Sequence, residues 1–552
     1  MEIHEGTKMK KSTIITVVVG AMIVVALVIV YRLGGTLIGA KIEQKAANLG
    51  LTPNQVAAHG PLPGDVGLYA KELACQQQIP TPGYYSSLNG AEISDSERSG
   101  VFPCATFLGA FDKPNQVYAW RSVDDYPGIS YINNRQPGEL YIVGGEYPTL
   151  EDPVPVGPYL AKADAATGKE IWRTYLDNAN ASGWLIGNTN LNILDNGNLA
   201  LAWWNQIVLI DGDTGLILKH NTLPTGEAPA ADANFKHLTI APDRTLIMKT
   251  QTRPVGCTEQ GTVGIIKCIE KGMKMPNSVL VAVNPDTLEA LDMFQLPEPA
   301  PSPHIVTTFE GRIAIYIGMN ESARRYFWDP ATKKLSADES WVIYPMQKGQ
   351  TTATAPTVMG DWVAFQLNGA GSSVKASSIL VADARDPKRM KVVFPFGELK
   401  PGEWSFAPPK CGGDPENHMI YSADMGVGKV AGIKLDPDSG ELTTLFVVDD
   451  ATTTFQPLIG PKDQRVLLLT KMKQNVAKEP SKLALFTGNY KEQLTWRDAA
   501  TGKIFAESDF FEPLTINSLT PPGFGGRIYF PSAADKGFYV LQVMPKQAQS
   551  DK

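Results

Sequence analysis

The sequence is poor in charge and has no basic stretch. Asp, Glu, Lys and Arg make up 19% of its 552 residues, and the formal net charge is −7 at pH 7. No run of Lys or Arg occurs in the body of the chain, so it offers no broad basic surface that would neutralise nucleic-acid phosphates. The 50 Gly and 41 Pro residues favour many short strands joined by tight turns. We therefore expect an all-β protein that does not bind nucleic acid.

The sequence also lacks the local motifs of several enzyme classes. It contains no C-x-x-C or C-x-x-C-H, which argues against a thioredoxin-like redox pair and against attached c-type haem. It has no nucleophile elbow and no phosphate-binding loop, and its His, Cys, Asp and Glu residues form no spaced set of metal ligands. The sequence accordingly predicts no catalytic residue, no metal ligand and no cofactor.

One apolar run is long enough to cross a membrane. Residues Ile14 to Tyr31 carry no charge, and a helix of that length spans a hydrocarbon layer of roughly 30 Å. Lys8, Lys10 and Lys11 precede the run, so the positive-inside rule places the N-terminus in the cytoplasm. We predict a single-pass protein of the cell membrane whose remaining chain lies on the periplasmic or extracellular side.

A cleaved signal peptide is the alternative interpretation of this run. Ile38, Gly39 and Ala40 resemble a weak cleavage site. A retained anchor is favoured because the run is longer than a typical signal-peptide core and its flank has no clear A-x-A.

The five cysteines all fall on the predicted outer side, where disulfides form. Cys257 and Cys268 bracket a short segment of hairpin type that a disulfide would close. Cys75 and Cys104 would staple the segment before the repeats in the same way. Cys411 is then left over, and we interpret it as a buried or unpaired thiol.

A turn of the form Asp-x-x-Thr/Ser-Gly recurs along the chain at separations of 45 to 73 residues. The side chain of Asp or Asn accepts a backbone N–H two residues on, and Gly supplies the positive φ that closes the turn. The copies, some of which depart from this form, start at Asp164, Asp211, Asn284, Asp329, Asp383, Asp436 and Asp498.

Strand-like runs flank each turn, so the repeating unit is a four-stranded antiparallel meander. Second strands such as Glu139 to Val143 count to eight, and the last unit has no fourth strand of its own. The run Gln116 to Arg121, upstream of the first unit, has no unit to join. Pairing it with the last unit would close a ring and remove an open edge. The sequence predicts an eight-bladed β-propeller, with seven blades as the alternative.

The predicted domain boundaries follow from the anchor and the ring. The segment before the ring reads as a helical stem over Ile42 to Leu49 followed by a Pro- and Gly-rich stretch, and the sequence leaves open whether it packs on the ring. In order, the expected parts are a cytoplasmic N-terminus (1–12), a transmembrane anchor (13–32), a stem and linker (33–114), the propeller (115–545) and a C-terminal tail (546–552).

The segment Asp164-Ala-Ala-Thr-Gly-Lys-Glu-Ile-Trp172, with its partial copy at Asp498 to Lys503, resembles the repeat of the quinoprotein-type (PQQ-like) β-propellers. The resemblance covers roughly residues 116 to 545. It implies either an alcohol or sugar dehydrogenase that holds pyrroloquinoline quinone and Ca²⁺, or a non-catalytic scaffold such as the lipoprotein of the outer-membrane β-barrel assembly machinery. The adjacent Cys–Cys pair that caps the cofactor in many of those dehydrogenases is absent here.

Polar residues on the predicted inner strands form a second candidate site. We expect Asn190, His237, His304 and Asn517 to be candidates for lining the central channel. Channel histidines act as nucleophiles in propeller arylsulfotransferases, which makes an enzyme of that kind an alternative function. A simply hydrated polar residue at the channel mouth is the favoured interpretation.

The function we predict is a protein-binding or assembly scaffold that presents the faces of the ring to other envelope or membrane proteins. The insert from Thr252 to Asn277 is the candidate contact element. Its alternative is a plain surface loop.

Overall fold

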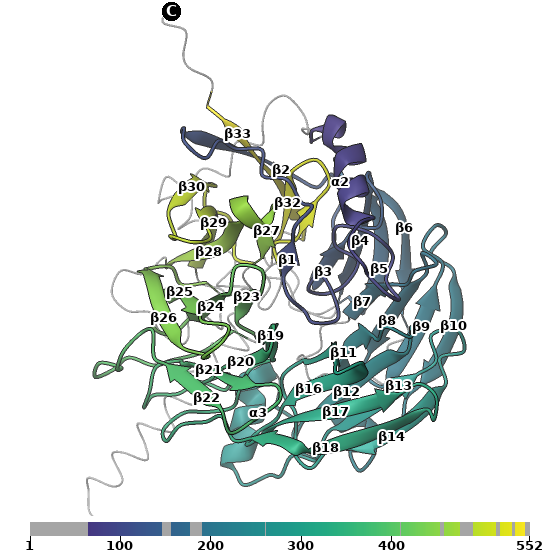
Figure 1. The fold of residues 1–552 in the computed structure, drawn as a ribbon. Coiled ribbons are helices and arrows are strands. Elements are labelled where there is room, and N and C mark those ends of the chain that lie inside the picture. The colour runs from purple at the N-terminus through teal and green to yellow at the C-terminus, as the bar shows by residue number, and fades with distance from the viewer. Residues whose placement is uncertain are drawn as a thin grey trace, which may run out of the picture.

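Eight antiparallel sheets surround one axis in the computed structural model (Figure 1). The structure describes residues 64–145, 156–176, 190–259, 261–408, 410–452, 457–474, 490–514, 519–532 and 536–546. The predicted anchor (13–32), the helical part of the stem (42–49) and Asn517 lie outside these residues. Within the described ranges, no helix is both long and apolar enough to cross a bilayer.

Each of the first four blades is a meander of four strands in chain order, from the inner strand to the outer one. These blades are β3 (Tyr131–Asn133), β4 (Glu139–Gly144), β5 (Tyr159–Asp164), β6 (Glu170–Tyr175); β7 (Asn190–Ile193), β8 (Leu199–Trp203), β9 (Gln206–Ile210), β10 (Ile217–Thr222); β11 (Ala233–Ile240), β12 (Leu246–Thr252), β13 (Val279–Val283), β14 (Ala290–Gln295); β15 (His304–Phe309), β16 (Arg312–Gly318), β17 (Ala323–Asp329) and β18 (Lys334–Ile343).

The remaining four blades repeat this order, except that the last takes its outer strand from upstream of the ring. They are β19 (Thr357–Met359), β20 (Trp362–Gln366), β21 (Ile379–Asp383), β22 (Met390–Val393); β23 (Gly412–Asp414), β24 (Met419–Asp424), β25 (Lys429–Leu435), β26 (Leu442–Val448); β27 (Leu458–Ile459), β28 (Val466–Gln474), β29 (Tyr490–Asp498), β30 (Ile504–Glu507); β31 (Pro522–Gly523), β32 (Arg527–Pro531), β33 (Phe538–Pro545) and β2 (Asn115–Arg121).

Strand β2 closes the ring. It pairs antiparallel with β33 from Asn115 opposite Pro545 to Arg121 opposite Tyr539. The eight-bladed closed propeller predicted from the sequence is therefore confirmed, including the strand that completes the last blade. Other short elements are β1 (Val101–Phe102), α2 (Tyr69–Gln76), α3 (Gly261–Glu270) and the 3₁₀ turns η1 (Val66–Leu68), η2 (Ala230–Asp232) and η3 (Lys462–Gln464).

The ring has two faces that differ in their connections. Successive strands of a meander run in opposite directions, so the turns between first and second strands and between third and fourth strands share one face, which we call the turn face. The connections between second and third strands and between blades lie on the other face. We call it the insert face because the connection from β12 to β13 contains α3.

The recurrent Asp turns adopt the predicted geometry. Asp164 Oδ1 accepts from the backbone N–H of Ala166 at 3.2 Å, and Asp498 Oδ1 accepts from the N–H of Ala500 at 2.8 Å. These bonds hold the chain reversal between the third and fourth strands of a blade.

Aromatic side chains of one blade dock onto the turn of the next. Trp120 Nε1 donates to the carbonyl oxygen of Ala166 at 2.7 Å, and Trp362 Nε1 donates to that of Pro437 at 2.8 Å. Each indole thus buries its ring between two blades while its N–H is satisfied by the neighbouring turn. The same role is filled by Trp172 with Asp213, Trp341 with Asp383, Tyr141 with Gly212, Tyr421 with Ala499 and Tyr529 with Ala165.

A glycine in the turn can also leave room for the docked aromatic ring, in addition to adopting a positive φ. Gly440 has φ +76°, and a Cβ placed there would lie 2.3 Å from the Trp362 ring. A side chain at this position would therefore both strain the turn and displace the indole.

We predict that Gly440→Ala lowers the free energy of unfolding by about 2 to 4 kcal/mol, the sum of left-handed strain and overpacking. Gly311→Ala is the matched control, because Gly311 has φ +75° and open space around its Cβ position. It should cost only the strain, about 1 to 2 kcal/mol. Urea unfolding of both variants tests this, and equal losses would contradict aromatic docking as a constraint on the turn.

Both predicted disulfides are present, and Cys411 is buried and unbonded. The expectation of a hairpin-type loop between Cys257 and Cys268 was wrong, because the segment forms α3. Ile265 in this helix packs against Trp203 and Trp204. Burial of that side chain supplies the stabilisation that a short isolated helix lacks.

Candidate functional sites on the axis and at the rim

The axis of the ring is filled by the chain itself. Residues 83–104, which we call the axial loop, enter from the turn face and are closed by the Cys75–Cys104 disulfide. Figure 1 shows β1, part of this loop, inside the ring of blades. Residues 64–114 belong to the segment that the sequence assigned to the stem and linker. The structure shows that this part of the segment packs on the ring.

Contacts of the axial loop reach the inner strands of seven blades or the residues next to those strands. A segment that touches so many inner strands must lie across the axis, so it takes the place of an open channel. Its partners, by blade, are Asn89 N with Asn134 Oδ1 at 3.2 Å, Tyr85 N with Ile193 O at 3.0 Å, Ser96 Oγ with Ile240 O at 2.6 Å, Val306 N with Ser96 O at 2.9 Å, Lys410 Nζ with Glu97 O at 3.5 Å, β1 with β27, and Leu88 with Phe524.

Charged groups of the axial loop are paired within the ring. Arg98, which is 1% exposed, forms an ion pair with Glu92, and Tyr131 Oη donates to Glu92 Oε1 at 2.7 Å. Thr307 on β15 donates its hydroxyl to Glu97. Buried charges are tolerated only when paired in this way, so the cluster ties the loop to blades 1 and 4.

Lys410 is a buried amine that contacts the axial loop. It is 2% exposed, and burial lowers its pKa to about 8, although Cys411, Asp95 and Glu97 favour the charged form. Burial likewise raises the pKa of Glu97. Both shifts favour the neutral forms, as expected for ionisable groups removed from water.

We predict that stability rises with pH between about 8 and 10.5 because of Lys410. In that window the unfolded chain, with its ordinary lysine pKa of 10.5, binds a proton that the folded chain has released. The gain over the window is about 3 kcal/mol. Lys410→Met should lack this gain, which urea midpoints at pH 7.5, 9 and 10.5 would measure. Parallel pH profiles for the two proteins would contradict the assignment.

The sequence-predicted channel residues lie on inner strands where they are described. His237 is on β11 and His304 is on β15, and they are 2% and 0% exposed. His304 Nε2 lies 2.8 Å from Thr239 Oγ1 in the neighbouring blade, and burial lowers the pKa of this imidazole well below its usual value. The backbone of Asn190 starts β7, and Asn517 lies outside the described residues. The structure does not bring these four residues together into one site.

The buried indoles and the axial carboxylates that the structure describes are not free to hold a quinone with a calcium ion. Such a pair requires an accessible indole and free oxygen ligands. Trp203, Trp362 and Trp496 are at most 2% exposed between blades, and the axial carboxylates Glu92 and Glu97 already have partners in the ring. Among the residues that the structure describes, no group of three or more His, Cys, Asp or Glu is placed to hold a metal ion.

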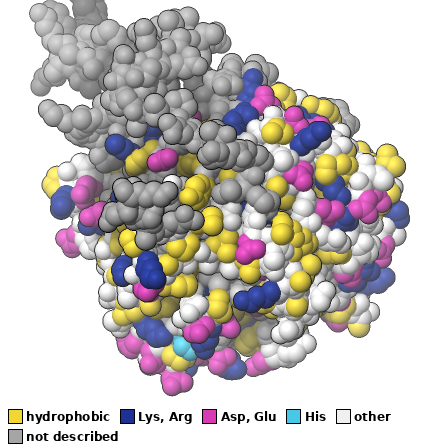
Figure 2. Space-filling view, turned by 90° about the horizontal axis from the view of Figure 1, so that it is seen from above, with side chains coloured by type: hydrophobic (Ala, Val, Ile, Leu, Met, Phe, Trp, Pro, Cys, Tyr) yellow, Lys and Arg dark blue, Asp and Glu magenta, His cyan; other side chains and the backbone are white. Residues whose placement is uncertain are grey.

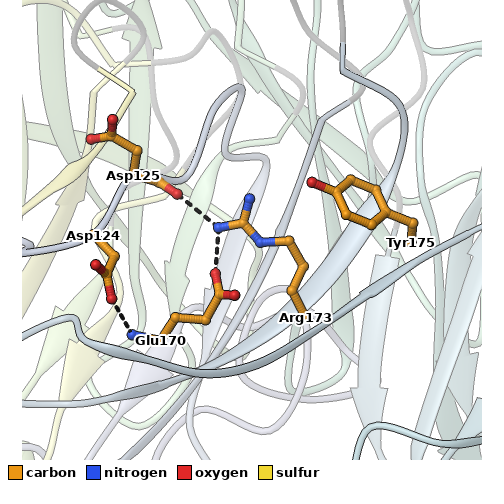
Figure 3. Close-up of a pocket in the computed structure, with 5 residues that line it drawn as sticks. All are labelled: Asp124, Asp125, Glu170, Arg173 and Tyr175. Atoms are coloured by element: carbon orange, nitrogen blue, oxygen red, sulfur yellow. Dashed lines mark hydrogen bonds and ion pairs between the residues drawn. The ribbon is translucent and has the colours of Figure 1, made fainter.

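A groove of about 590 Å³ opens at the outer rim between blades 8 and 1. Figure 3 shows the Arg173 guanidinium between Glu170 and the backbone of Asp125, with Tyr175 on its other side. Arg173 donates to Asp125 O at 2.7 Å and pairs with Glu170 at 2.5 Å. Asp124 Oδ2 accepts from the N–H of Glu170 at 2.7 Å, so the acidic loop after β2 is tied to the start of β6.

Arg173 forms the floor of this rim groove and rests on two buried tyrosine rings. The Arg173 guanidinium lies 4.6 Å from the ring centre of Tyr159 and 5.3 Å from that of Tyr126. The phenol of Tyr126 donates to Gly168 O at 2.9 Å, so the floor is fixed. Tyr175 on the wall is 57% exposed. The groove thus offers a rigid cationic floor, carboxylates at one end and an open aromatic wall, an arrangement suited to binding.

Sequence reasoning missed the axial loop, Lys410 and the rim groove. The Asp124-Asp125 pair directly after β2 was the available signal for the groove. This pair can be interpreted as part of a groove only once ring closure is known to place the loop after β2 beside the start of β6.

Comparisons with known proteins show the fold. The sequence matches no protein-family model and no curated protein. Among solved structures, a quinohemoprotein alcohol dehydrogenase from Pseudomonas putida HK5 is 9% identical with a TM-score of 0.50, covering 87% of this chain and 84% of that one. A quinohemoprotein alcohol dehydrogenase from Comamonas testosteroni is 13% identical over 88% and 86%, with a TM-score of 0.47. BamB from Moraxella catarrhalis is 12% identical over 77% and 99%, with a TM-score of 0.42.

At these identities the likeness is one of architecture. The chain resembles the PQQ-type propellers in fold, as its turn repeat predicts.

Proposed function

We propose that this protein is a membrane-anchored, extracytoplasmic β-propeller that binds other envelope or membrane proteins as an assembly scaffold. The rim groove is the observation that carries the proposal. Its wall exposes Tyr175 at 57%, and the nearby Ile171 and Val123 are 58% and 61% exposed. Exposed aromatic and aliphatic side chains around a groove are what a protein contact buries.

The placement of the N-terminal segment supports a defined orientation. Asp65 N donates to Gly525 O at 3.1 Å, on the turn face of blade 8. A chain anchored through residues 13–32 would approach the ring from this side. The turn face would then look toward the membrane, and α3 with its exposed Ile269 would look away from it.

Charge on the visible surface is mixed. On the side shown in Figure 2, Lys and Arg alternate with Asp and Glu, and hydrophobic side chains lie among them outside the grey atoms. Contacts with other proteins commonly combine such polar rims with apolar centres. This supports protein partners over a uniformly charged ligand.

We predict that a photo-cross-linking residue placed at Tyr175 or Ile269 in native membranes forms an adduct of one defined mass with a partner protein. Met293 on β14, the outer strand of blade 3, is 41% exposed and is the control position, which should form no adduct with that partner. Removing residues 1–33 should move the chain from the membrane pellet to the supernatant and weaken the adduct, because the anchor raises the effective concentration of the ring at the membrane.

Two results would contradict the proposal. Without an adduct at either position, the ring would not act as a scaffold through its rim or insert face. A chain without residues 1–33 that stays in the pellet would show that the apolar run is not the anchor.

A further inference from the structure

The outer strand of blade 1 has an open edge along the rim groove. Leu176 N donates to Pro158 O at 2.9 Å on the inward side, and Thr174 and Trp172 continue this hydrogen-bonded alternation with β5. The N–H and C=O groups of Arg173 and Tyr175 therefore point outward. Among the described residues, no backbone group pairs with them there.

The side chains along this edge leave it accessible. Edge strands are usually protected by a charged side chain that projects into solvent. The charged side chains of β6 are those of Glu170 and Arg173, which pair with each other. The Arg173 guanidinium lies 4.6 Å from the ring centre of Tyr159, and its side chain is 16% exposed. Tyr175, two residues further on and on the same side of the strand, is 57% exposed, and Ile171 at the β-bulge of this strand is 58% exposed. Within the described part of the chain, the edge thus presents an aliphatic side chain, an aromatic side chain and backbone groups without a partner.

Charge in the groove is negative at one end. The carboxylates of Asp124, Asp125 and Glu170 lie near two guanidinium groups, those of Arg121 and Arg173. One negative charge is left over, next to the start of β6. A positively charged side chain would complement it.

We propose that the rim groove binds an extended segment of a partner protein, which adds a strand to the open edge of β6. The segment carries aliphatic residues at alternate positions, one of which covers Tyr175, and a Lys or Arg that lies beside Asp125 and Glu170. Backbone pairing supplies affinity and the alternate side chains supply specificity. This inference rests on the proposed scaffold function and names the chemistry of its partner.

The test uses the full chain purified in detergent and a fluorescein-labelled peptide, acetyl-Lys-Thr-Val-Thr-Val-Thr-Lys-amide, followed by fluorescence anisotropy. Its seven residues span about 23 Å as a strand, and its symmetric charges suit either strand direction. We expect saturable binding. A peptide with Glu in place of Lys, and a peptide N-methylated at every second residue, should each bind at least tenfold more weakly.

Variants of Tyr175 separate backbone pairing from side-chain contact. Tyr175→Ala and Tyr175→Pro both remove the ring, but only proline removes the outward N–H, which an edge position tolerates. We expect Tyr175→Pro to weaken binding at least tenfold more than Tyr175→Ala. Met293→Ala on β14, where Met293 is 41% exposed, is the control and should bind as the parent chain does. Melting curves of all three variants show whether they are folded.

The outcomes discriminate between the occupants and between the two proposals. Equal affinity for the Lys and Glu peptides would overturn the proposed added strand. An N-methylated peptide that binds as tightly as the unmethylated one would also overturn it. A concentration-dependent dimer of the full chain that Tyr175→Pro abolishes would assign the groove to a second copy and overturn the partner segment. No peptide binding, with the Ile269 adduct retained in membranes, would overturn this inference and leave the scaffold. Loss of both would overturn the scaffold as well.

Discussion

Docking of an aromatic side chain onto the turn of the neighbouring blade is the interaction on which the ring depends. Each blade buries its two faces only against its neighbours, so the seams must repeat at a constant spacing. An indole such as Trp362 achieves this because its ring fills the space between two blades and its N–H donates to Pro437 O. Where the indole lies this close to the turn, glycine supplies both the positive φ and the room, as at Gly440. The contact recurs at the turns that start at Asp164, Asp211, Asp383, Asp436 and Asp498.

Filling of the axis determines where the protein can meet other molecules. The axial loop occupies the space that an open propeller would offer to a ligand, and its Arg98–Glu92 pair is buried with it. The inner strands therefore serve as a second core, and Lys410 is held there with its pKa lowered by burial. What remains accessible is the rim and the two faces. The groove between blades 8 and 1 arises where the ring closes, because β2 comes from upstream and its following loop must cross to blade 1.

Local features of this fold were readable from the sequence, whereas the sites were not. Short stretches of sequence were enough to predict several features, because their residues indicate the local structure by themselves. These features are the turns from Asp164 to Asp498, the eight units, the closing strand and both disulfides. The axial loop could not be foreseen, because its contacts join residues such as Ser96 and Ile240 that are far apart in the chain and carry no pattern. α3 was missed because its stability comes from Ile265 packing on Trp203 and Trp204 rather than from its own ten residues. The groove depends on ring closure, a property of the assembled blades.

Hydrogen exchange of the full chain tests most directly the claim that the axis is filled and that recognition lies at the rim. Amides of residues 84–102 that donate within the ring, such as Tyr85, should exchange as slowly as those of the inner strands β7 and β11, since they would open only with the ring itself. Exchange of these amides at the rate of an exposed loop would contradict the account. The channel would then be open, and its polar residues, His237 and His304 among them, would again be the place to look for function.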